Sequence, residues 1–166
     1  LPERSRACVL VQALAGVRAA EAQRLTWQNI SLEHRLITIS AGTAKTASRR
    51  HTPICDALLA WITPLHRGTG PLVQNPNTLR RDLAIARCKA LITKWPQNAL
   101  RHTCASAWCC LEADVARVAS WCGNSPSIIH AHYKALLTHE QATAWFNVRP
   151  PASSAGTVVQ FSVAAC

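Results

Sequence analysis

Glycine, proline and capping residues divide this chain into short stretches, each about the length of one helix. Gly16 follows an apolar pattern of helical period over residues 3–15, and Gly123 follows another over residues 114–122. Pro126 comes directly after a serine, and this pair is typical of a helix start. No apolar run approaches the roughly 20 residues that a membrane-spanning helix needs. The sequence therefore predicts several short, packed helices.

The helical pattern covers most of the chain, with one interruption of a different kind. Predicted helices cover residues 3–15, 18–25, 56–62, 77–93, 98–111 and 114–122, a segment starting at Ser125-Pro126, and a segment from Thr138, with Gln141 completing a capping box, to about Phe146. In the helix over 77–93, the expected N-cap is Asn77 and the inward residues are Leu79, Leu83, Ala86, Ala90 and Leu91. Residues 36–39 and 50–54 have strand character and flank the polar stretch 41–49. The predicted fold is mainly α with a small antiparallel β-sheet, in the α+β class.

The length of 166 residues suits one domain, which we expect to cover residues 1–146. Residues 147–166 are rich in proline, alanine, serine and glycine, and we expect them to be disordered or to pack on a partner. The chain begins with Leu1 and holds no methionine. We therefore expect a fragment, with a further domain upstream of it.

The charge of the chain is strongly positive and unevenly distributed. Lysine and arginine number 18 against 8 aspartates and glutamates. From Arg35 to Arg101 there are eleven basic residues and two acidic ones, Asp56 and Asp82. A one-sided balance of this kind favours a polyanionic partner such as nucleic acid, through salt-dependent attraction to phosphates. A general contribution to solubility is the alternative interpretation.

The eight cysteines form no C-x-x-C pair, and most have apolar neighbours in helical patterns. Free cysteine behaves as a small buried hydrophobe in a reducing compartment. We therefore interpret them as core residues rather than as disulfides or metal ligands.

Several segments carry residues suited to phosphate chemistry, although each has an ordinary structural explanation. Arg18 precedes Glu21 by one helical turn, where a surface ion pair is common, and Lys45 lies in a polar turn. Arg101 is near the start of a predicted helix, where the helix dipole also favours an anion. Tyr133 is the only tyrosine of the chain, and a lone tyrosine usually packs at the edge of a core. Their combined order and spacing is the informative feature.

That order resembles the catalytic domain of the tyrosine recombinases, the phage-integrase family, over about residues 3–146. The matching residues are Gly16-Val17-Arg18 with Glu21, then Lys45, then Asn98-Ala99-Leu100-Arg101-His102, then Gly123-Asn124, and finally Tyr133. The resemblance implies a DNA strand transferase in which Tyr133 attacks a phosphodiester to give a 3′-phosphotyrosyl intermediate. It also implies that no metal or cofactor takes part.

The resemblance further implies a role for each matching residue. Arg18 and Arg101 would clamp the phosphate and lie at the site rather than in the core, with Lys45 as general acid. Asn98 and Asn124 would donate hydrogen bonds to phosphate oxygens, and Glu21 would orient Arg18. Expected contacts with DNA outside this set come from Arg49, Arg50 and His102.

Two matching positions depart from the family pattern, because Asn98 and Asn124 stand where the family has histidine. Asparagine donates hydrogen bonds but cannot accept a proton as a base. Loss of general-base help costs about 10²–10⁴ in rate. We therefore expect a slower but chemically competent site.

The partners implied are double-stranded DNA and, for the full-length protein, further copies in a tetramer on DNA. We expect a cytoplasmic protein without a membrane segment, encoded by a bacterium or a phage. The main alternative is a catalytically impaired DNA-binding remnant of an integrase. A type IB topoisomerase and a purely structural helical domain are further alternatives, and the short interval to Tyr133 disfavours the former.

Overall fold

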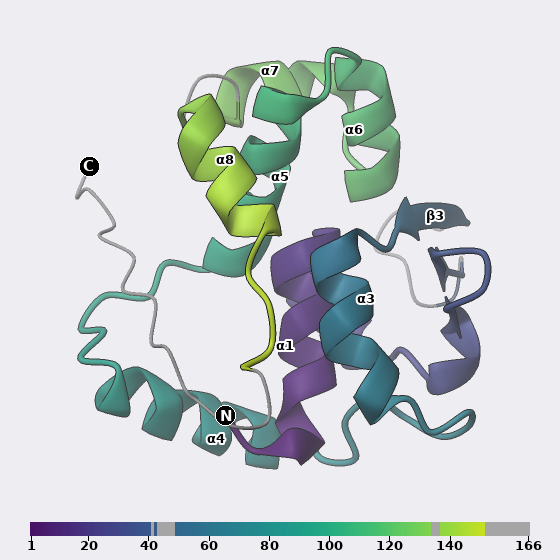
Figure 1. Ribbon diagram of the computed structural model, residues 1–166, viewed down its shortest axis with the longest axis vertical. Coiled ribbons are helices and arrows are strands. Elements are labelled where there is room, and N and C mark those ends of the chain that lie inside the picture. The colour runs from purple at the N-terminus through teal and green to yellow at the C-terminus, as the bar shows by residue number, and fades with distance from the viewer. Residues whose placement is uncertain (41, 43–48, 134–136, 152–166) are drawn as a thin grey trace.

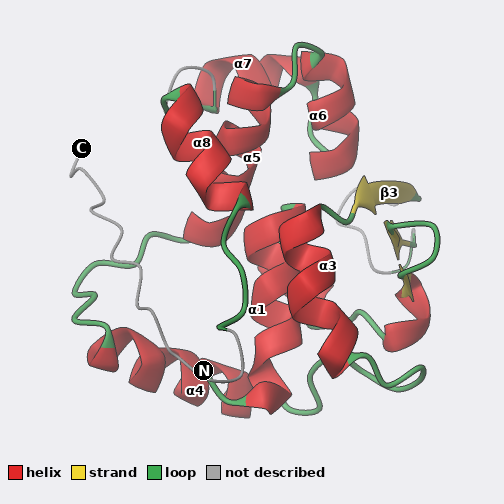
Figure 2. Ribbon diagram, viewed as in Figure 1, coloured by secondary structure: helices red, strands yellow, loops and turns green. Residues whose placement is uncertain are grey.

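The computed structural model describes residues 1–40, 42, 49–133 and 137–151, and it is mainly helical. The helices are α1 (Glu3–Ala15), α2 (Ala19–Ala22), α3 (Asp56–Ile62), α4 (Pro76–Lys89), α5 (Ala99–Leu111), α6 (Val115–Cys122), α7 (Pro126–His132) and α8 (His139–Phe146), with 3-10 turns at Trp27–Asn29 and Thr63–Leu65. Helix α1 runs through the middle, where it packs against α3 and α5 (Figure 1). Helices α5 to α8 form one end of the molecule, while α4 lies at the other (Figure 2).

A small sheet packs beside the helices. Its strands are β1 (Ile30–Ser31), β2 (Leu36–Ile39) and β3 (Arg50–Pro53), in the order β1-β2-β3, with both neighbouring pairs antiparallel. The register of the second pair places Ile37 opposite Thr52 and Ile39 opposite Arg50. The α+β prediction and both predicted strands are confirmed. The two-residue strand β1 was not predicted, because so short a segment has no visible alternation.

The predicted helix ends are confirmed where glycine or a capping side chain defines them. Gly16 and Gly123 adopt left-handed φ values of 57° and 62° at the ends of α1 and α6. The Ser125 hydroxyl accepts from the Ile128 amide at the start of α7. Thr138 and Gln141 form both halves of a capping box on α8.

Two helix predictions were wrong in their bounds. The N-cap of α4 is Asn75, not Asn77, and its side chain accepts from the Asn77 amide at 2.9 Å. Helix α4 ends at Lys89, because Leu91 adopts a left-handed φ of 55° and is 87% exposed. The predicted inward positions Ala90 and Leu91 are therefore both on the surface. The predicted helix over residues 18–25 is shortened to the single turn of α2.

Two clusters of buried residues hold the fold together. The larger one joins α1, α3 and the sheet, and the smaller one lies among α5, α6 and α7. Cys8, Cys104 and Cys122 are fully buried in these clusters, as predicted for core cysteines. Cys88 is exposed, so the prediction fails there, and Cys166 lies outside the described residues.

Helix α8 and the residues after it are fixed to the rest of the domain by two tryptophans. Trp145 Nε1 donates to the Ala13 carbonyl of α1 at 2.9 Å, and Trp61 Nε1 of α3 donates to the Val148 carbonyl at 3.2 Å. These attachments continue past residue 146, where we expected the domain to end. Most of the predicted tail, residues 152–166, lies outside the described residues.

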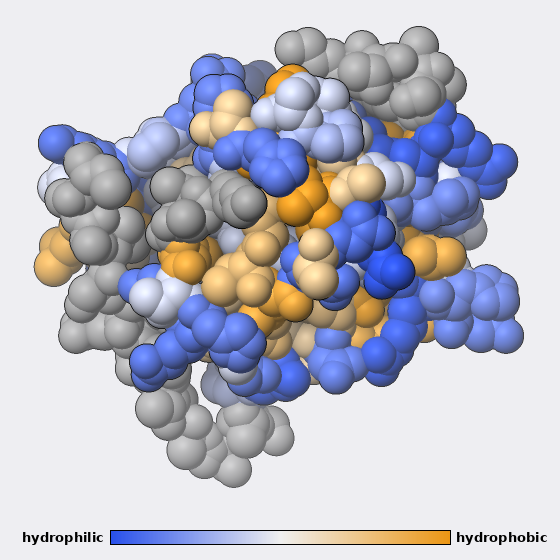
Figure 3. All heavy atoms as spheres, turned by 90° about the horizontal axis from the view of Figure 1, so that it is seen from above, coloured by the Kyte–Doolittle hydropathy of each residue, from blue (hydrophilic) through white to orange (hydrophobic). Residues whose placement is uncertain are grey.

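The described part of the chain contains no helix that is long and apolar enough to span a membrane. Figure 3 shows the end of the molecule formed by α5 to α8, with apolar residues gathered in the middle of the face and hydrophilic residues around them.

Candidate active site

Arg18 lies in the turn between α1 and α2, where it is the N-cap residue of α2. Its Nη2 donates to the Gly123 carbonyl at 2.6 Å and to Asn124 Oδ1 at 2.8 Å. Its Nη1 and its backbone amide both donate to the Glu21 carboxylate, each at 3.1 Å. The side chain is 19% exposed, so the guanidinium is held in place while part of it still reaches the surface.

Glu21 is buried and binds two arginines. Arg50 Nη1 and Nη2 donate to the two carboxylate oxygens at 3.0 and 2.6 Å, which is the bidentate fork geometry. Burial is the largest single influence on the pKa of Glu21 and raises it. The hydrogen bonds and charges of Arg50 and Arg18 together outweigh burial, and the pKa of Glu21 is lowered. The carboxylate therefore stays ionised between its two partners.

Arg101 lies in the first turn of α5 and is 4% exposed. Its Nη1 donates to the Gly16 carbonyl, and its Nη2 donates to the Cys122 carbonyl at 2.6 Å. Burial lowers the pKa of Arg101, yet a guanidinium stays protonated at any ordinary pH. This side chain lies within the core as well as at the site, which corrects the expectation that Arg101 is free of the core.

Asn124 joins the two predicted phosphate ligands. Its Oδ1 accepts from Arg18 Nη2 at 2.8 Å and from Arg101 Nη2 at 3.2 Å. The turn at Gly123, with its left-handed φ, ends α6 and directs the next residue toward the starts of α2 and α5. Two fixed cations thus reach one oxygen acceptor, which is how a non-bridging phosphate oxygen is bound.

Tyr133 follows the last residue of α7 and is 5% exposed. Its ring stacks on His102 with centroids 5.2 Å apart and packs in the smaller apolar cluster. When ionised, the phenol is close enough to Arg101 to raise the pKa of that guanidinium. In the described chain the buried side-chain polar atoms without a hydrogen-bond partner are His66 Nε2 and Arg87 Nε. The phenol oxygen of Tyr133 is not among these atoms.

The sequence matches the model of the phage integrase family over residues 1–140. The chain belongs to the phage integrase family. Its fold is similar to that of XerA recombinase, with a TM-score of 0.66 and 19% identity, covering 87% of this chain and 56% of XerA. It is also similar to the catalytic domain of bacteriophage HP1 integrase, with a TM-score of 0.61 and 23% identity, covering 85% of this chain and 80% of that domain.

The chain thus spans little more than half the length of XerA recombinase, while its fold is that of a tyrosine recombinase catalytic domain. No curated protein sequence gives a significant match.

Asn98 is another predicted site residue of this phage integrase family member, and it is the N-cap of α5. Its φ is 58°, and its side chain does not cap the helix. Asparagine tolerates this left-handed backbone better than most residues. Lys45 lies outside the described residues, and Arg49 is exposed.

His102 is exposed, and its pKa is lowered first by burial of part of the ring and then by the charges of Arg101 and His132. Its contact with the Tyr133 ring places it beside the predicted nucleophile rather than in the protein interior. A role in contacting DNA stays a prediction for His102 and Arg49.

Arg50 is buried, although we predicted it as a residue that contacts DNA. Its side chain is 6% exposed and points inward from β3 to Glu21, with Nε donating to the Trp121 carbonyl at 3.2 Å. The signal was present in the strand pattern, because alternation puts Arg50 on the same inner face as the buried Thr52. Direct contact with DNA would break a buried ion pair, so we do not retain that role for Arg50.

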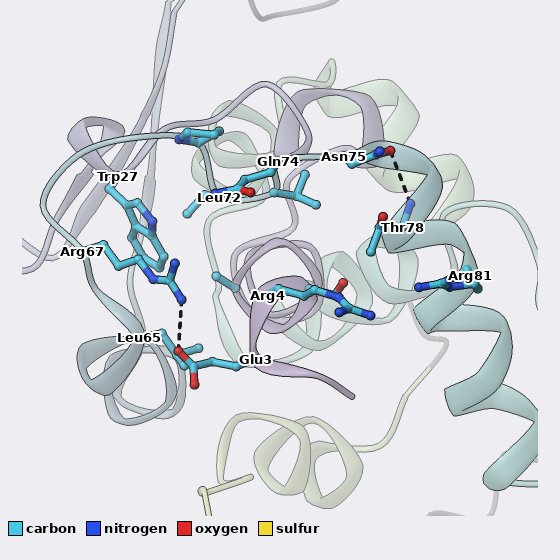
Figure 4. A pocket seen from close by; sticks show the side chains of 14 residues that line it. Glu3, Arg4, Trp27, Leu65, Arg67, Leu72, Gln74, Asn75, Thr78 and Arg81 are labelled. Carbon is cyan, nitrogen blue, oxygen red and sulfur yellow. Dashed lines mark hydrogen bonds and ion pairs between the residues drawn. The ribbon is translucent and has the colours of Figure 1, made fainter.

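Two cavities in the described part of the fold are not lined by the arginines or the tyrosine of this site. A cavity of about 320 Å³ is bordered by the start of α1, by Trp27 and by the start of α4 (Figure 4). Among its charged side chains, Arg67 pairs with Glu3, as the figure shows, and Arg4 pairs with Asp82. A second cavity of about 360 Å³ lies where α5, α6 and α7 meet. Neither includes Arg18, Arg101 or Tyr133.

Among the described residues there is no group of three or more histidine, cysteine, aspartate or glutamate side chains that could hold a metal ion. The described residues of the site offer two guanidinium groups, amide side chains and a phenol.

Proposed function

We propose that this chain is the catalytic part of a site-specific DNA recombinase that cleaves and rejoins strands through a 3′-phosphotyrosyl intermediate. The observation that carries the proposal is the convergence of Arg18 and Arg101 on a single oxygen, Asn124 Oδ1. In the proposed complex a non-bridging oxygen of the scissile phosphate takes this position. The two guanidinium groups then stabilise the charge that builds up on the phosphate in the transition state.

The proposed chemistry is an exchange of phosphodiesters. The Tyr133 oxygen bonds to phosphorus, the bond from phosphorus to the 5′ oxygen breaks, and the phenol proton passes to solvent water. Lys45 protonates the leaving 5′ oxygen, which becomes a free hydroxyl. Attack by the 5′-hydroxyl of a partner strand reverses these steps and restores the phenol. Because the covalent link preserves the bond energy, the reaction consumes no nucleotide.

Asn98 and Asn124 act in this proposal as hydrogen-bond donors to the phosphate. Neither can remove the phenol proton. A site without general-base help is expected to be slower by about 10²–10⁴ than one that has it.

The burial of Tyr133 favours a second candidate function, that of a DNA-binding module without catalysis. A phenol that is 5% exposed and packed against His102 must be displaced before it can attack. Tyr133 lies after the last residue of α7, however, so its movement requires no unwinding of a helix interior. We therefore place catalysis first. Assembly into a tetramer on double-stranded DNA, by a protein longer than this chain, belongs to the same proposal.

A nicked suicide duplex tests the choice between the two functions. Cleavage next to the nick releases a short strand that cannot return, so covalent adducts accumulate and are resolved by denaturing electrophoresis. We expect an adduct with the parent chain and none with Tyr133→Phe, while both bind duplex equally at low salt. Binding without an adduct in the parent chain would instead support the DNA-binding module. No binding at low salt would overturn both.

A further inference from the structure

The Arg50 side chain crosses from the sheet to the phosphate-binding arginines. Its three nitrogens donate to Glu21 Oε1 at 3.0 Å, to Glu21 Oε2 at 2.6 Å and to the Trp121 carbonyl at 3.2 Å. Both partners lie outside the sheet, in α2 and in α6. Arg50 therefore ties β3 to the two elements that carry Arg18 and Asn124.

Glu21 transmits this attachment to Arg18. Its Oε1 accepts from Arg50 Nη1 and from Arg18 Nη1, and its Oε2 accepts from Arg50 Nη2 and from the Arg18 backbone amide. The carboxylate is 2% exposed, so water contributes little to its orientation. The fork of Arg50 fixes the carboxylate plane, and that plane fixes the position of the Arg18 guanidinium.

The turn at Gly123 packs directly on the guanidinium of Arg50. A Cβ atom added to Gly123 would lie 2.9 Å from Arg50 Nε and 3.0 Å from both Cδ and Cζ. The Gly123 carbonyl accepts from Arg18, and Asn124 follows it in the chain. The flat face of the Arg50 guanidinium therefore packs against the Gly123 turn, while two of its nitrogens bind the Glu21 carboxylate.

We propose that Arg50 is a positioning residue for strand cleavage, which acts on Arg18 through Glu21 and on Asn124 through the Gly123 turn. The inference rests on the proposed function, because it concerns the same phosphate site. Arg50 also follows Lys45 by five positions, at the beginning of β3. It thereby anchors the strand next to the predicted general acid to the arginines that bind the phosphate.

The test compares Arg50→Lys with a matched control, Arg4→Lys. Lysine keeps the charge but lacks the planar fork, so geometry rather than charge is changed. Arg4 also binds a carboxylate in bidentate fashion, with Nε and Nη2 2.9 and 2.8 Å from the oxygens of the buried Asp82. It lies about 18 Å from Gly16 along α1, a helix of 13 residues. The control therefore changes another bidentate pair with a buried carboxylate far from the site, with an arginine that is 57% exposed where Arg50 is 6% exposed.

Adduct formation on the suicide duplex is measured as a rate at saturating DNA, beside the dissociation constant and the thermal unfolding of each variant. We expect Arg50→Lys to form the adduct about 10–100-fold more slowly than the parent chain, with DNA binding changed less than twofold. Arg4→Lys should cleave at the parent rate even if its unfolding temperature falls as much as that of Arg50→Lys. If Arg50→Lys does not fold, the double variant Glu21→Gln with Arg50→Gln removes both buried charges, and the same slow cleavage is expected.

A second measurement is independent of activity. The arginine side-chain N–H signals in ¹⁵N NMR spectra report the hydrogen bonds of Arg18 in the free protein, and Arg18→Lys identifies which signals these are. We expect them to move in Arg50→Lys and to stay in place in Arg4→Lys. Absence of an adduct with the parent chain would refute the proposed function. The NMR comparison alone would then show whether Arg50 positions the Arg18 side chain. Parent-like cleavage in Arg50→Lys, or unmoved Arg18 signals, would overturn the inference.

Discussion

Asn124 Oδ1 accepts a hydrogen bond from Arg18 Nη2 at 2.8 Å, although the two residues are 106 positions apart in the chain. The contact joins the turn after α1 to the turn after α6, and both turns depend on a glycine with left-handed φ. An amide oxygen is a weaker hydrogen-bond acceptor than the singly charged phosphodiester of DNA. In the free protein the amide therefore keeps the guanidinium in place, and in the proposed complex a DNA phosphate displaces it.

Arg18→Ala is expected to reduce adduct formation at least 10²-fold, because the loss of one preorganised donor costs about 10²–10³ in rate. Glu21 keeps its bidentate partner Arg50, so the variant should remain folded, with an unfolding midpoint in urea close to that of the parent. Arg6→Ala, which removes a half-buried arginine of α1, controls for the loss of one positive charge. Cleavage by Arg18→Ala at the rate of this control would show that Arg18 does not act on the phosphate.

Arg101→Ala should behave differently, with losses of both activity and stability. The substitution leaves the buried carbonyls of Gly16 and Cys122 without their donor, at a cost of about 1–3 kcal/mol for each. Chemical unfolding of Arg101→Ala beside Arg18→Ala measures this difference. Equal unfolding free energies for the two variants would contradict the core role of Arg101.

Asn124→His restores the residue type of the family pattern and should speed cleavage by Tyr133. Histidine can donate to the phosphate as asparagine does, and its neutral form can also accept a proton. We expect the adduct rate to rise and to acquire a dependence on pH near the ordinary histidine value of about 6.5, which the parent rate should lack. Rates measured from pH 5 to 9 test this. A rate equal to that of the parent at every pH would argue against a base at position 124.

Local signals in the sequence were sufficient for most of the fold. Gly16, Gly123 and the Thr138 capping box place helix ends because each acts through a backbone conformation or hydrogen bond within a few residues. The end of α4 was missed for the same reason, since Leu91 adopts a conformation that glycine usually takes. A leucine in that position carries no signal.

The candidate site was predictable only in part. The order of Arg18, Arg101 and Asn124 along the chain matched a family pattern, whereas their shared hydrogen bonds are long-range and leave no local trace. Arg50 shows the limit most clearly, because a basic residue next to a turn looks like a contact for DNA. Its inward direction follows from strand alternation, but its partner Glu21 lies 29 positions away.

The ion pair between Arg4 and Asp82 should make the stability of this protein fall in acid. The hydrogen bonds of Arg4 and then of Ser5 lower the pKa of Asp82 from its ordinary 3.8 to about 2. A carboxylate with a lowered pKa stabilises the fold fully above pH 3.8, and this contribution is lost as the pH falls toward 2. We expect the unfolding free energy of Arg4→Gln, measured in urea between pH 5 and 2, to change less with pH than that of the parent. A variant as acid-sensitive as the parent would assign the loss to other carboxylates, of which Glu21 is the first candidate.

Leu91→Gly should stabilise the protein, because Leu91 has a φ of 55° and its side chain is 87% exposed. The left-handed conformation costs a residue with a Cβ roughly 1–2 kcal/mol, while glycine adopts it freely. For a chain of this size, about 1 kcal/mol corresponds to a rise of about 2–4 °C in the unfolding temperature. Ala90→Gly is the control, since Ala90 has an ordinary φ of −88° and glycine there only adds disorder to the unfolded chain. Calorimetry should therefore give shifts of opposite sign in the unfolding temperature for the two neighbouring substitutions. Shifts of the same sign would mean that the turn after α4 does not depend on the conformation of Leu91.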